Sequence, residues 1–156
     1  MLRQATPRPV TRWPRGWALR VALCLSCLLA LEAAWAETVV VVSATSPVTA
    51  LSAEQVSDLF LGKVGRFPDG AGPVQTFDLS EGSVAREQFY RRLTGRDTAQ
   101  MTAYRARMMF TGRGQPPIEL ARDEQVRRAV AGNPLALGYL ERSAVDASVR
   151  IVLVMH

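Results

Sequence analysis

Histidine and cysteine are nearly absent from this 156-residue chain, which has one His and two Cys. The histidine is the terminal His156, and chain termini are usually mobile, so no Ser-His-Asp arrangement is expected. Cys24 and Cys27 lie inside an apolar run, where small apolar residues are common, so their C-x-x-C spacing does not indicate redox chemistry. No acidic spacing resembles a calcium loop either, and we expect no enzyme, metal or cofactor.

A basic surface is also missing, although the formal net charge is +5. Five arginines lie within the first twenty residues, and residues 37–156 carry 14 basic against 13 acidic side chains. No basic stripe with interleaved aromatic residues occurs in that segment, so a nucleic-acid partner is not expected.

The sequence also lacks a hydrophobic run long enough to cross a membrane comfortably. Its apolar segment Val21–Leu31 is too short. It follows the arginine-rich start and precedes Ala34-Trp35-Ala36, which is the pattern of a cleaved secretory signal peptide. A retained anchor is the alternative, disfavoured because no polybasic flank follows the run. The sequence therefore predicts a signal peptide over residues 1–36, one mature domain over residues 37–156, and a periplasmic location.

Strand and helix patterns alternate along the predicted mature domain. Strands are predicted at Thr38–Val42, Val74–Leu79, Ile118–Leu120, Leu137–Leu140 and Val149–Val154. Helices are predicted from an N-cap at Ser52 to Gly62, over Val84–Leu93, from a cap at Asp97 to Phe110, and from a cap at Asp123 to Gly132. This alternation predicts a three-layer α/β domain in which helices flank a mixed sheet.

The segment Phe77–Arg86, FDLSEGSVAR, contains the candidate binding site. It combines the end of a strand, a turn of small residues, and a helix whose N-cap is Ser83. Such a helix start directs free backbone N–H groups and the positive end of the helix dipole at one point, which suits an oxyanion. Gly82 permits close approach, and the hydroxyls of Ser80 and Ser83 are expected to donate. An ordinary strand-to-helix turn is the alternative.

The helix that follows this turn has one predicted core face. Ala85, Phe89 and Leu93 share that face, which places Arg86, Tyr90 and Arg91 on the solvent side.

Four segments together resemble the phosphate-type periplasmic substrate-binding proteins. Leu59–Lys63 resembles the "IF-x-GK" helix end of that family, and Asp78–Arg86 resembles its "RSDGSGTR" anion loop. Phe110–Pro117 resembles its glycine-rich loop, and Asn133–Tyr139 resembles its "PGAIGY" strand. The order and spacing match over nearly the whole predicted mature domain. The resemblance implies a single lobe of the type II periplasmic-binding-protein fold, whereas full-length members clamp phosphate between two lobes.

The resemblance also implies where a ligand would bind. The implied ligand-binding residues are Ser80, Gly82, Ser83, Val84, Ala85 and Arg86. Leu79 stands where the family has arginine, and Val84-Ala85 replaces its Gly-Thr pair. The expected ligand is inorganic phosphate or a similar oxyanion, held weakly, and the expected partner is a membrane transporter of the ABC type or a sensor. The alternative is a ligand-free interaction module that docks on a transporter, sensor or porin.

Overall fold

The structure, a computed structural model, describes residues 37–112 and 114–155. The predicted signal peptide and His156 lie outside the described residues. The described residues form one compact unit. Among the described residues, no helix combines the length and the apolar character that crossing a membrane requires.

The observed strands and helices follow the predicted order. The strands are β1 (Thr38–Ser43), β2 (Gln75–Leu79), β3 (Ile118–Leu120), β4 (Ala136–Glu141) and β5 (Val149–Val154). The helices are α2 (Ala53–Phe60), α3 (Val84–Thr94), α4 (Thr98–Phe110) and α5 (Asp123–Ala131), and a short 3₁₀ turn spans Arg142–Ala144. The bounds agree with the predicted bounds to within about two residues, which is the usual uncertainty of helix and strand ends.

The five strands form one mixed sheet in the order β3-β2-β4-β1-β5. β2 runs parallel to β3 and β4, whereas β1 runs antiparallel to β4 and β5. The side chains of Val39–Val42 in β1 are fully buried, because this strand lies between two others and both of its faces are covered.

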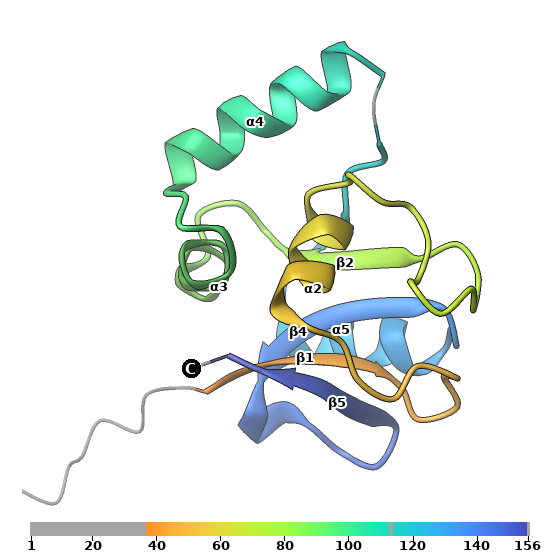
Figure 1. Cartoon of the computed structure of the whole chain (residues 1–156). Helices are drawn as coiled ribbons and strands as arrows, with labels where there is room; N and C mark the ends of the chain where they lie inside the picture. Colours follow the sequence, from red (N-terminus) through yellow and green to blue (C-terminus); the bar gives the residue numbers. More distant parts are fainter. Residues whose placement is uncertain (1–36, 113, 156) are drawn as a thin grey trace, which may run out of the picture. The chain divides into compact units, whose positions relative to one another are not determined.

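Helices cover both faces of the sheet, as the alternation of side chains along β4 shows. A Cβ atom added at Gly138 would lie 2.7 Å from Val126 and 2.9 Å from Val130, so this residue faces α5 closely enough to require glycine. The next residue, Tyr139, faces the other way and contacts Phe60 of α2 and Phe89 of α3. The predicted three-layer arrangement is confirmed, with α5 on one face and α2 and α3 on the other (Figure 1).

An aromatic cluster joins α2 and α3 to the sheet. The rings of Phe89 and Tyr139 stack with centroids 3.8 Å apart and an interplanar angle of 7°. The ring of Phe60 meets Phe89 edge-on at 4.9 Å. Such pairs add to the stability that burial of their apolar area provides, and they fix α3 on this face of the sheet.

The predicted solvent face of α3 is wrong for two of its three residues. Tyr90 is buried and the Arg86 side chain is largely buried, while Arg91 is exposed as expected. The reason is that the chain turns at Gly95, which has a φ of 71°, and returns as α4 across this side of α3 (Figure 1). A local apolar period cannot reveal such a second covering element.

The helix caps agree with the sequence at α2 and α4 and differ at α5. Ser52 forms the predicted capping box with Gln55. Asp97 is the N-cap of α4, as predicted, and also forms a capping box with Gln100. Asp123 does not cap α5, which instead has Arg122 at its N-cap and no side-chain cap. The carboxylate of Asp123 accepts a hydrogen bond from the N–H of Glu141 at 2.8 Å, so it links α5 to the end of β4.

Candidate functional site

The predicted anion loop lies where β2 ends and α3 begins. Because β2, β3 and β4 are parallel, this loop is at the edge formed by their carboxyl ends, where open α/β sheets commonly bind ligands. Gly82 has a φ of 84°, a conformation that favours glycine. Ser83 is the N-cap of α3, as predicted, and its Oγ accepts a hydrogen bond from the N–H of Arg86 at 3.4 Å.

Backbone donors remain free at this helix start. The N–H groups of Gly82, Val84 and Ala85 have no hydrogen-bond partner among the described residues. Val84 and Ala85 are the first two residues of α3, whose N–H groups cannot be satisfied within the helix. The turn can therefore offer neighbouring N–H donors and the positive end of a helix dipole to an oxyanion.

The Ser80 hydroxyl, which was expected to donate to a ligand, binds within the protein instead. The Ser80 N–H donates to the carbonyl of Leu120 at 2.9 Å, and the Oγ lies 3.3 Å from the same oxygen. Both groups thus bind the end of β3. The sequence alone could not reveal this contact, because Leu120 lies forty residues further along the chain.

The Arg86 side chain is likewise engaged within the protein. Its Nη1 donates to the carbonyl of Leu79 at 2.8 Å and to Oε1 of Glu119 at 2.7 Å. Its Nε lies 3.5 Å from Oδ2 of Asp78. The guanidinium group is thus paired with the carboxylates of Asp78 and Glu119. To contact a ligand directly, as predicted, Arg86 would have to break one of these two ion pairs.

Acidic side chains lie beside the free donors. A hollow between α3 and α4 is lined by Glu81, Gly82, Ser83, Arg86, Glu87, Tyr90, Thr98, Met101 and Thr102. Glu81 accepts a hydrogen bond from the Thr102 hydroxyl at 3.0 Å, and Glu87 pairs with Arg91. These carboxylates would repel an anion placed at the free N–H groups.

The Asp78 carboxylate is buried near the site and is surrounded by polar partners. It accepts hydrogen bonds from the Tyr90 hydroxyl at 2.9 Å, the Leu79 N–H at 2.9 Å and the Tyr139 hydroxyl, and it pairs with Arg105 of α4. This cluster was not predicted from the sequence. The available signal was an aspartate on the same strand face as the apolar Val74, since a charge at such a position needs partners.

Burial and mutual charge perturb the ionisation of this cluster. Burial, reinforced by the charge of Asp78, raises the pKa of both Tyr90 and Tyr139 above the ordinary value. Burial acts to lower the pKa of Arg105, but the nearby Tyr90 and Asp78 outweigh it and the pKa is raised. The arginine therefore stays protonated and the tyrosines stay neutral at physiological pH.

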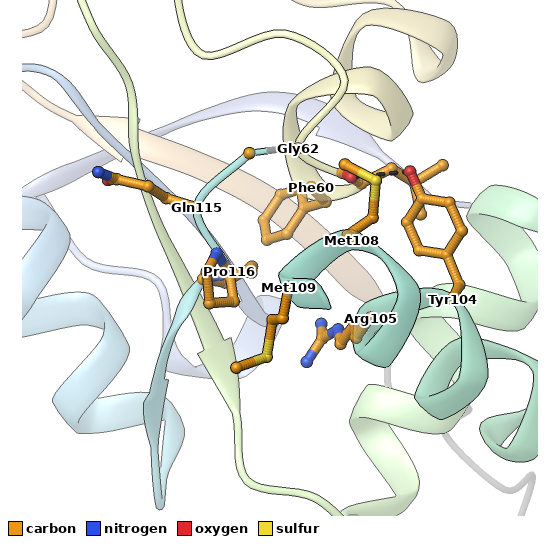
Figure 2. A pocket seen from close by; sticks show the side chains of 11 residues that line it. Phe60, Gly62, Tyr104, Arg105, Met108, Met109, Gln115 and Pro116 are labelled. Atoms are coloured by element: carbon orange, nitrogen blue, oxygen red, sulfur yellow. Dashed lines mark hydrogen bonds between the residues drawn. The ribbon is translucent and has the colours of Figure 1, made fainter. Parts of the chain in front are cut away.

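Arg105 and its neighbours also hold α4 to the domain. The Tyr104 hydroxyl donates to the carbonyl of Leu61 at 2.9 Å, the bond dashed in Figure 2. Met108 and Met109 line a small pocket with Phe60 at the end of α2 (Figure 2). Within residues 37–112 and 114–155, no group of three or more His, Cys, Asp or Glu side chains is arranged to hold a metal ion.

No protein-family model and no curated protein matches the sequence. Solved structures do match. One is a Clostridium perfringens structure with bound phosphate, of a protein assigned as a phosphate ABC transporter substrate-binding protein, at 20% identity and a TM-score of 0.60. Another is an ABC-type phosphate transport receptor from Vibrio cholerae, at 18% identity and a TM-score of 0.59. A third is PstS from Borrelia burgdorferi, at 10% identity and a TM-score of 0.58.

Each match covers 74% of this chain but only 44%, 45% and 46%, respectively, of the matched structure. The chain therefore spans less than half the length of the structures it resembles. At these identities the similarity establishes the fold, which is that of part of a phosphate ABC transporter substrate-binding protein.

Proposed function

We propose that this chain is an exported, single-lobe oxyanion-binding protein that acts as a substrate-binding component alongside an ABC-type transporter. The supporting observation is the set of free N–H groups at Gly82, Val84 and Ala85, at the start of α3. Solved structures of the same fold are of phosphate transport proteins, one of them with bound phosphate. Phosphate or a similar oxyanion is accordingly the proposed ligand, held between Ser80 and Arg86.

The proposed binding is weak for three physical reasons. The donors are neutral N–H groups, Glu81 and Glu87 lie beside them, and within the described residues no second lobe covers the site. A hydrogen bond to a charged partner contributes about 1.5–3 kcal/mol, and every 1.4 kcal/mol changes affinity about tenfold. Lacking one such partner and the second wall, the site is expected to bind phosphate with a Kd on the order of millimolar.

Phosphate titration followed by amide chemical shifts tests the proposal, with chloride at equal ionic strength as the control. The shifts should move at Gly82, Ser83 and Val84, and Ser83→Ala should weaken binding. Ala85→Thr should strengthen binding by adding a hydroxyl donor. Leu79→Arg is not a useful gain-of-function variant, because the Leu79 side chain is only 3% exposed and a charge there would be buried.

Submicromolar binding by the wild-type protein would contradict the weak-site argument. Unchanged amide shifts at Ser83 in high phosphate would instead favour the docking module, for which a separate observation exists. Phe110 and Met109 at the end of α4 are 95% and 66% exposed, and exposed apolar residues are typical of contact surfaces. The partner proposed for that function is the membrane component of an ABC-type transporter. Photo-crosslinking to that component from position 110, but not from Glu54 on α2, would support it.

A further inference from the structure

Two arginines near the site each form ion pairs with the same two carboxylates. Arg86 comes from α3 and Arg105 from α4, and their side chains are 12% and 15% exposed. Each contacts both the Asp78 carboxylate, which is 0% exposed, and the Glu119 carboxylate of β3, which is 46% exposed. The arrangement thus has an inner anion position that is closed and an outer one that reaches solvent.

The two positions hold their carboxylates very differently. At the inner position, Asp78 also accepts hydrogen bonds from Tyr90, Tyr139 and the Leu79 N–H. At the outer position, Glu119 uses the single oxygen Oε1, which lies 2.7 Å from Nη1 of Arg86 and 3.5 Å from Nη1 of Arg105. Arginine binds oxyanions best through two parallel hydrogen bonds, so the Glu119 contact leaves binding capacity unused.

We propose that the outer position is an oxyanion-binding site in its own right, and that the Glu119 carboxylate occupies it when no ligand is present. An incoming carboxylate or phosphate places two oxygens against Arg86 and Arg105, and the Glu119 side chain turns into solvent. The pairing of β3 with β2 involves backbone groups, so the strand stays in place. With Asp78 neutralising one arginine, a bound monoanion restores the charge balance that Glu119 provided.

This site is separate from the helix start described above. It uses the guanidinium groups of Arg86 and Arg105, whereas the helix start uses the N–H groups of Gly82, Val84 and Ala85. Glu119 acts as an internal competitor for the arginines, so removing its charge should reveal the site. The size of the gain measures how strongly Glu119 occupies the position in the wild-type protein.

Glu119→Gln tests the proposal, because it keeps the shape of the side chain and removes the charge. The wild-type protein and the variant are titrated with phosphate and, separately, with acetate, and the Nε–H signals of Arg86 and Arg105 are followed by NMR. The affinity of the variant should rise about tenfold or more, which corresponds to about 1.4 kcal/mol or more. Glu54→Gln, which removes the same charge from an exposed position on α2, should leave the affinity unchanged.

The outcomes separate this site from the helix start. A gain accompanied by shifts of the arginine Nε–H signals supports the proposal, and the anion with the larger gain identifies the preferred geometry, tetrahedral or planar. Equal affinities for the wild-type protein, Glu119→Gln and Glu54→Gln would overturn it. A gain whose shifts are confined to Gly82 and Ser83 would also overturn it, while leaving the helix-start site intact.

Discussion

Replacing Asp78 by asparagine should destabilise the domain strongly, because this buried carboxylate neutralises Arg105 and accepts hydrogen bonds from two tyrosines. Asparagine keeps the size of the side chain but removes the charge and brings an NH₂ group toward other donors. Breaking a buried ion pair from one side costs about 3–5 kcal/mol. At about 4 °C per kcal/mol for a domain of this size, the melting temperature should fall by about 12–20 °C.

Chemical denaturation measures the total cost, and Asp58→Asn provides a matched control. Asp58 forms a 2.8 Å pair with Lys63 at the surface, so the same substitution there should cost no more than about 1 kcal/mol. Amide hydrogen exchange adds a spatial test, since the Asp78 carboxylate anchors α4 through Arg105. Exchange in Asp78→Asn should accelerate more in α4 than in α5. A cost below about 1 kcal/mol, or equal acceleration in both helices, would refute the anchoring role.

Three further predictions concern the core, alkaline pH and processing. Phe89→Ala should lower the free energy of unfolding by about 3–5 kcal/mol, because it opens a cavity. Arg91→Ala, at the surface, should change it by no more than about 0.5 kcal/mol. Denaturant curves in which Arg91→Ala is the more destabilising variant would contradict the orientation of α3. Because burial raises the folded-state pKa values of Tyr90 and Tyr139, their contribution to stability should be complete below the unfolded-state pKa of about 10 and be lost as the pH rises above it. Spectrophotometric titration should show that these two tyrosines ionise only when the protein unfolds at alkaline pH. N-terminal sequencing of exported protein should begin at Glu37, and a soluble cytoplasmic pool that retains Met1 would contradict cleavage of a signal peptide.

Elements whose signals are local could be predicted from the sequence. The valine run of β1, the capping box at Ser52 and the N-cap at Asp97 each depend on residues that are close in sequence, and all three are where the pattern placed them. The N-cap at Ser83 is also a local signal, which is why the turn between β2 and α3 lies where it was predicted.

Contacts between distant segments account for what the sequence could not show. Tyr90 is buried because α4 crosses that side of α3, and Ser80 is engaged because the end of β3 lies beside it. Asp123 leaves its expected cap for the N–H of Glu141, eighteen residues away. The polar cluster around Asp78 depends on such contacts throughout, since its tyrosines and arginines come from α3, α4 and β4.

The strand order also constrains how this domain can fold. β1 begins at Thr38, yet its two neighbours in the sheet are β4 and β5, so its register joins Thr38 to Glu141 and Val39 to Val154. Contacts this distant in sequence require large loops to close before any stabilising pairing forms, which slows folding. The pairing of β1 with β5 therefore cannot form while β5 is still being made. Until then, the valines of β1 are exposed and prone to pair with another chain. A chaperone that prevents aggregation would have to cover them first.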